Sequence, residues 1–103
     1  MNRKPKRVDL TKLARGMPCQ IRVPTVCNGN PETTVACHVR LIGISGAGYK
    51  APNLLIAFGC SSCHAVVDGQ QTSSYDYGAR RLMLLEGMAR TQVWLAEHGF
   101  VSW

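Results

Sequence analysis

The sequence has no apolar run long enough to cross a bilayer, and it has few acidic residues. A membrane-spanning helix needs about 18 or more consecutive apolar residues, and every apolar stretch in this chain is shorter. The basic N-terminus is not followed by the apolar segment of a secretory signal. These absences predict that the protein has no membrane partner and is cytoplasmic, in a reducing compartment where disulfides are rare.

Basic residues outnumber acidic residues by 12 to 6, which gives a net charge of +6. Half of the basic residues lie close to the N-terminus, namely Arg3, Lys4, Lys6, Arg7, Lys12 and Arg15. Such a cluster favours binding to the phosphate backbone of a nucleic acid, and the alternative is a solubilising tail. We therefore expect residues 1–16 to form a basic arm and residues 17–103 to form one domain.

The cysteines are the strongest sign of a metal site. A domain built from 103 residues has a small core, so a bound metal ion would help to stabilise it. Cys60 and Cys63 form a CxxC motif, which places two thiolates within reach of one ion. Cys19 and Cys27 are the best candidates to complete a tetrahedral structural zinc site, the alternative being two buried thiols. Cys37 is the fifth cysteine, and it is expected either to lie in the core or to bind metal.

The pattern along the chain predicts a mixed α and β fold. Strands are expected over residues 19–23, 33–41 and 54–58, and a glycine-rich loop over 43–52. A short helical turn is expected over 9–15, a short helix from Ser61 or Ser62 to near Gly69, and a long helix over 76–98. Asp76 and Gly99 would bound the long helix, and its apolar face would consist of Leu82, Leu85, Ala89, Val93 and Ala96.

Two histidines stand out by their positions. Cys37 and His38 are adjacent in a predicted strand, so their side chains would point to opposite faces, one to the core or a metal and the other to a cleft. His64 and Asp68 are one helical turn apart and could share a divalent cation, although a simple surface pair has the same spacing.

The order of these features resembles the HNH, or ββα-metal, endonucleases. The residues that carry the resemblance are Cys37-His38, Gly46-Ala-Gly48, Asn53-Leu54 and Cys60-Ser-Ser-Cys63-His64. Over nearly its whole length the chain is also similar to the small lambdoid-prophage family of HNH-type nucleases. The stretches that carry this closer similarity begin at Cys19, Val26, His38 and Glu86. The implied fold is a small zinc-stabilised α+β domain with a ββα-metal core and a long C-terminal helix.

The resemblance implies a role for each matching residue. His38 matches the general base that takes a proton from water, and Asn53 matches the residue that orients this base. His64 matches a ligand of a catalytic Mg²⁺ or Mn²⁺, and Asp68 is added from helical spacing as a second ligand. Cys37 stands where many family members carry a hard metal ligand, so the ion is softer, or Cys37 does not bind it, or the site is degenerate.

The sequence therefore predicts a metal-dependent DNA endonuclease of phage or prophage origin, acting in recombination or replication in a bacterial host cell. One rival is a non-catalytic, zinc-stapled DNA-binding module. Another is a protein-interaction module anchored by Trp94 and Trp103, for which ordinary packing is the alternative. HNH enzymes often act as dimers, so the long helix is also a candidate homodimer interface.

Overall fold

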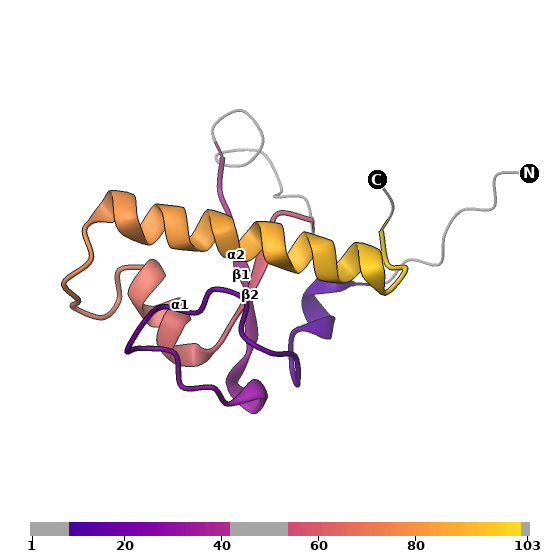
Figure 1. Cartoon of the computed structure of the whole chain (residues 1–103), viewed down its shortest axis with the longest axis horizontal. Coiled ribbons are helices and arrows are strands. Elements are labelled where there is room, and N and C mark those ends of the chain that lie inside the picture. The colour runs from indigo at the N-terminus through magenta and orange to yellow at the C-terminus, as the bar shows by residue number, and fades with distance from the viewer. Residues whose placement is uncertain (1–8, 42–53, 102–103) are drawn as a thin grey trace, which may run out of the picture.

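The computed structural model describes residues 9–41 and 54–101 and shows a small α+β fold (Figure 1). Two 3-10 helices, η1 and η2, come first, followed by a pair of strands and then by helices α1 and α2. Their bounds are Leu10–Leu13 for η1, Pro31–Thr33 for η2, Val35–His38 for β1, Ile56–Gly59 for β2, Ser61–Val67 for α1 and Tyr77–Glu97 for α2. No helix in the described residues is both long and apolar enough to cross a membrane.

The two strands form an antiparallel sheet in which His38 pairs with Ile56 and Val35 pairs with Gly59. All four residues of β2 are buried, and α2 runs across the strands (Figure 1). On the outer edge of β2, the backbone hydrogen-bonding groups of Phe58 are paired with residues from two other segments. The backbone N–H of Phe58 donates to Thr91 Oγ1 at 2.9 Å, and its carbonyl accepts from Gln20 N at 2.6 Å.

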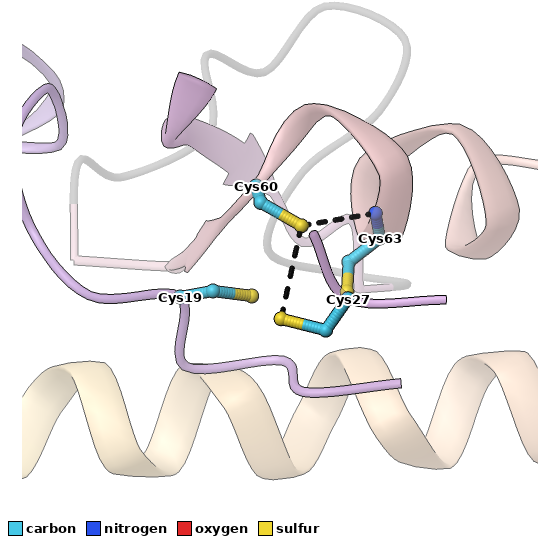
Figure 2. Close-up of side chains that lie close together, drawn as sticks. All are labelled: Cys19, Cys27, Cys60 and Cys63. Carbon is cyan, nitrogen blue, oxygen red and sulfur yellow. Dashed lines mark hydrogen bonds between the residues drawn. The ribbon is translucent and has the colours of Figure 1, made fainter. Parts of the chain in front are cut away.

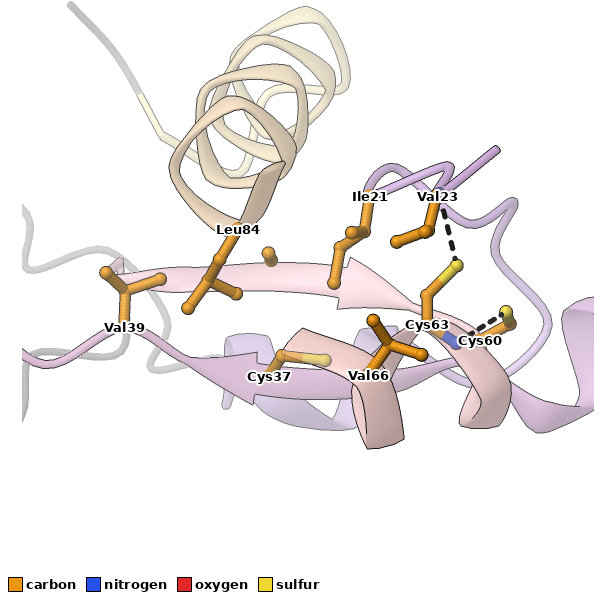
Figure 3. Packing of buried hydrophobic residues seen from close by; sticks show 9 residues of the cluster. Ile21, Val23, Cys37, Val39, Cys60, Cys63, Val66 and Leu84 are labelled. Atoms are coloured by element: carbon orange, nitrogen blue, oxygen red, sulfur yellow. Dashed lines mark hydrogen bonds between the residues drawn. The ribbon is translucent and has the colours of Figure 1, made fainter. Parts of the chain in front are cut away.

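The core has two parts, one on each side of β2. In the first, Ile21, Cys37, Val66 and Leu84 pack together from four different segments (Figure 3). The second contains Ala14, Ile56, Phe58 and Leu95, and Leu10 and Leu13 of η1 pack against it. Residues 10–14 therefore lie against the folded domain.

The ends of α2 are those that the sequence predicted. The Asp76 side chain accepts a hydrogen bond from Ala79 N at 2.7 Å, and Gly99 follows the helix with a φ of +77°. The predicted cap of α1 was wrong. The residue that caps α1 is Cys60, whose Sγ accepts from Cys63 N at 3.4 Å, and not Ser61 or Ser62.

The predicted apolar face of α2 was also wrong. The buried residues are Leu84, Gly87, Thr91 and Leu95, whereas Leu82 is 57% and Val93 42% exposed. Glycine and threonine contribute little to a hydrophobic pattern. They nevertheless define this face, because their small side chains let the helix backbone approach its neighbours closely.

The strand predicted over residues 19–23 does not form. The chain bends there instead, and Arg22 adopts the left-handed region with a φ of 59°. This bend turns the backbone N–H groups of Arg22 and Val23 toward the cysteine sulfurs described below. A regular strand would alternate these groups between two directions.

Candidate metal centre and active-site cavity

Four cysteines from two distant parts of the chain converge on one point (Figure 2). The sulfurs of Cys19, Cys27, Cys60 and Cys63 all lie within 4.8 Å of one another, and those of Cys27 and Cys60 are 3.9 Å apart. A tetrahedral ion with Zn–S bonds of about 2.3 Å would hold its sulfurs about 3.8 Å apart. The predicted cluster is therefore present, and its geometry can hold a metal ion such as zinc.

Backbone N–H groups surround the sulfurs of this cluster. Arg22 N donates to Cys19 Sγ, Val23 N to Cys63 Sγ and Cys63 N to Cys60 Sγ, each at 3.4 Å. Hydrogen bonds to sulfur favour the thiolate, which is the form that binds metal. The bend at residues 19–23 thus supplies two donors as well as a ligand.

The thiol pKa values show how burial and hydrogen bonding compete in the cluster. Burial raises the pKa of Cys27 and of Cys63. Burial also acts to raise the pKa of Cys60, but backbone hydrogen bonds from Cys63 and Asn28 outweigh it and lower the pKa to about 7. Hydrogen bonding therefore favours the thiolate of Cys60 more than the thiolates of Cys27 and Cys63.

Asn28 joins the Cys27 loop to the start of α1. Its Nδ2 lies 3.2 Å from the hydroxyl oxygens of Thr33, Ser61 and Ser62. In the sequence Asn28 belongs to the stretch beginning at Val26 that resembled the family, and nothing in that pattern reveals its contacts with α1. These contacts hold the two halves of the metal centre in register.

A second feature, a cavity of about 1100 Å³, lies next to the metal centre. His38 at the end of β1, His64 on α1 and Asp68 at the end of α1 all line it, so three of the predicted site residues come together. His38 and Asp68 are exposed and His64 is half-buried. Asp68 Oδ2 also accepts a hydrogen bond from Gln70 Nε2 at 2.9 Å. Asn53 lies outside the described residues.

Three arginines also line the cavity, and no motif in the sequence placed them there. Arg40 follows β1, while Arg80 and Arg81 lie in the first turns of α2. The Arg81 guanidinium donates to the backbone carbonyl of Arg40, so it ties α2 to the segment after β1. This cavity therefore combines imidazoles, a carboxylate and guanidinium groups, which together can bind a phosphate and move a proton.

A family model described as "Putative nuclease YbcO" matches residues 8–100. The chain belongs to the YbcO family.

The relatives are close and cover most of each chain. Over 90 residues the chain is 53% identical to "Putative nuclease YbcO" of Escherichia coli strain K12, covering 86% of this chain and 93% of that protein. The identity and coverage are the same for "Putative nuclease ybcO" of Enterobacteria phage 82. The solved "Structure of a putative bacteriophage protein from Escherichia coli str. K-12 substr. MG1655" has 44% identity and a TM-score of 0.73, covering 87% of this chain and 99% of that chain. The predicted prophage family is thus confirmed, and the wider HNH assignment stays a prediction.

In this YbcO-family protein Cys37 is a core residue. Its side chain is 2% exposed and packs in the first core cluster (Figure 3). Burial raises the pKa of Cys37 to about 12, so the thiol stays protonated near neutral pH. Cys37 also lies outside the four-sulfur cluster, and this place in the core favours the core interpretation over ligation to that ion.

Two residues of α2 that no sequence motif assigned to a site hold the first metal loop of this YbcO-family chain, which is the segment from Cys19 to Cys27. Arg90 Nε donates to the carbonyl of Gln20 at 2.6 Å, and its Nη2 donates to the carbonyl of Ile21 at 3.1 Å. Gly87 leaves room for Ile21 one turn earlier. Both residues belong to the stretch beginning at Glu86 that resembled the family. This resemblance was the one feature of the sequence that pointed to them.

The Trp94 ring packs against three other rings of the protein. It meets Phe58 edge-on at 5.7 Å and stacks on His98 at 4.1 Å and on Phe100 at 5.9 Å. These contacts favour ordinary packing over an anchor for a partner. Trp103 lies outside the described residues.

Proposed function

We propose that this YbcO-family protein is a metal-dependent DNA endonuclease of the HNH (ββα-metal) type, acting at the cavity. The observation that carries the proposal is the meeting of His38, His64 and Asp68 around one cavity rimmed by arginines. The order β1, β2, α1 in the chain and the nuclease names of the relatives support it.

In this proposal His38 is the general base. Its exposed imidazole takes a proton from a water molecule as the water oxygen bonds to phosphorus and the P–O3′ bond breaks. Neutral imidazole suits this task near pH 7. Asn53 is proposed to orient His38, as the family pattern implies.

Two kinds of metal are proposed, held by different residues. The four cysteines hold a structural Zn²⁺, because an all-thiolate tetrahedral set suits zinc. His64 and Asp68 would hold Mg²⁺ or Mn²⁺ at the cavity. The Asp68 carboxylate suits either ion, whereas the His64 imidazole is the softer ligand and is more usual for transition metals. When bound there, such an ion would supply Lewis-acid stabilisation of the charge that develops on the phosphate and on the leaving oxygen.

The arginines of the cavity are proposed to bind the DNA phosphates. Guanidinium groups form paired, charge-assisted hydrogen bonds with phosphate oxygens. Arg40 and Arg81 approach the cavity from two different elements, so together they would fix the backbone of the strand relative to His38.

The decisive experiment measures cleavage of plasmid and oligonucleotide DNA with Mg²⁺ or Mn²⁺. His38→Ala should lower the rate by roughly 10²-fold or more, as expected for loss of a general base. His98→Ala is the matched control, because His98 is exposed and contacts Trp94 at the far end of α2. Equal zinc content in all variants checks that the fold is intact.

Two outcomes would count against the proposal. If His38→Ala cleaves DNA as fast as the unaltered protein, His38 is not the general base. Salt-sensitive DNA binding with no cleavage under any metal would instead support a non-catalytic, zinc-stapled DNA-binding module.

A further inference from the structure

Tyr77 is an exposed aromatic residue at the mouth of the cavity. It is the first residue of α2 and lines the cavity together with His38 and His64. Its side chain is 71% exposed, the highest value among the large exposed hydrophobic residues in the described part of the chain. A tyrosine ring left in water gains free energy when a ligand covers it, so the exposed ring is available to a ligand beside the proposed active site.

The ring is held in place from one side by Arg80. The guanidinium carbon of Arg80 lies 5.9 Å from the centre of the Tyr77 ring, within the range of a cation–π contact. Arg80 is itself restrained, because its Nε donates to the carbonyl of Asp76 at 3.4 Å. Its Nη1 also lies against Gly69, where an added β-carbon would be only 2.7 Å away.

We propose that Tyr77 stacks on an unpaired nucleobase and so directs the enzyme to single-stranded or locally unpaired DNA. This inference rests on the proposed function, whose substrate class it names. Arg80 covers one face of the ring, and the high exposure of Tyr77 leaves the other available. The arginines of the same cavity carry the positive charge that a neighbouring phosphate needs.

The chemistry selects an unpaired base over a paired one. Inside a duplex each base is stacked on its neighbours, so neither of its faces is free to meet a side chain. Proteins that bind single strands combine a positively charged surface with aromatic side chains on which bases stack. Tyr77 with Arg40, Arg80 and Arg81 is such a combination on one rim.

The test compares the affinity of a short fluorescein-labelled oligonucleotide, single-stranded or annealed to its complement, in a His38→Ala background that prevents cleavage. The single strand should bind more tightly. Tyr77→Leu and Tyr77→Ala should weaken single-strand binding by roughly 5- to 150-fold, with a much smaller effect on the duplex. Tyr77→Phe and Tyr77→Trp should retain the affinity because they retain the ring.

Leu82→Ala is the matched control, because Leu82 is an exposed α2 residue that does not line this cavity. An oligonucleotide containing 2-aminopurine adds a direct signature. Its fluorescence should be quenched on binding to a protein with Tyr77, and the quenching should disappear in Tyr77→Leu.

Each outcome separates the two proposals. Tighter binding of the duplex, equal losses on both substrates, or unchanged quenching in Tyr77→Leu would overturn the stacking role. If the protein with native His38 cleaves single-stranded and duplex DNA equally well, this result would support the proposed nuclease activity and contradict the proposed role of Tyr77. If the protein prefers single strands only when residue 77 carries a ring, but cleaves no DNA, the role of Tyr77 is supported and the nuclease activity is contradicted.

Discussion

Gly87 in α2 lies so close to Ile21 that a β-carbon at position 87 would come within 3.1 Å of Ile21 Cα. It would also lie 3.3 Å from the carbonyl oxygen of Gln20. Because these are backbone atoms next to Cys19, the close approach fixes the first metal loop against α2.

We therefore expect Gly87→Ala to destabilise the protein. Alanine gains about 1 kcal/mol over glycine inside a helix, but overpacking against a backbone costs about 1–3 kcal/mol, so a net loss should remain. Gly78→Ala is the control, since its added carbon would meet only Asp76 Oδ1 at an ordinary 3.5 Å. Urea unfolding at a fixed zinc concentration measures both, and a stabilised Gly87→Ala would contradict the expected clash.

The metal centre should be necessary for folding. We expect purified protein to contain about one equivalent of zinc, and Cys63→Ser to lose both the ion and a cooperative unfolding transition, because binding a structural ion contributes folding free energy. Elemental analysis and circular dichroism measure this. Cys37→Ala, which changes a buried cysteine outside the cluster, should keep the zinc. A protein that stays folded after chelation would refute the expectation.

Thr91 should matter for its hydroxyl rather than for its size. Its Oγ1 accepts from Phe58 N at 2.9 Å and donates to the carbonyl of Gly87 at 2.7 Å, and the residue is fully buried. Thr91→Val leaves the Phe58 N–H buried without a partner, which should cost about 1–3 kcal/mol. Thr91→Ser keeps the hydroxyl and should lose less. Urea unfolding of the two variants gives the comparison, and equal losses would assign the effect to packing.

Cys37 should make stability fall at high pH. Burial raises its pKa from 9.0 to about 12, so between these values the thiol ionises in the unfolded chain but not in the folded one. Its contribution is full below pH 9 and decreases above it by about 1.4 kcal/mol per pH unit. Unfolding experiments from pH 8 upward should show a shallower decrease in Cys37→Ala. Identical slopes would show that Cys37 ionises equally in both states.

The parts of the site that could be predicted from the sequence were those set by short spacing. The CxxC motif, the His64–Asp68 turn and the bounds of α2 depend on residues within a few positions of one another. The buried face of α2 could not be predicted in this way, because Gly87 and Thr91 face the core for reasons of close approach and hydrogen bonding. The bend at residues 19–23 was also missed, since it depends on bonds to Phe58 and Cys63, far along the chain.

The helix α1 serves both features of the molecule at once. It begins beside Cys60, buries Cys63 in the metal cluster and presents His64, the next residue, to the cavity. Activity assays of the proposed nuclease must therefore distinguish the proposed structural ion from the proposed cavity ion. A sample stripped by a strong chelator and resupplied with magnesium alone would lack the anchor of α1, and its failure to cut DNA would be mistaken for a property of the reaction.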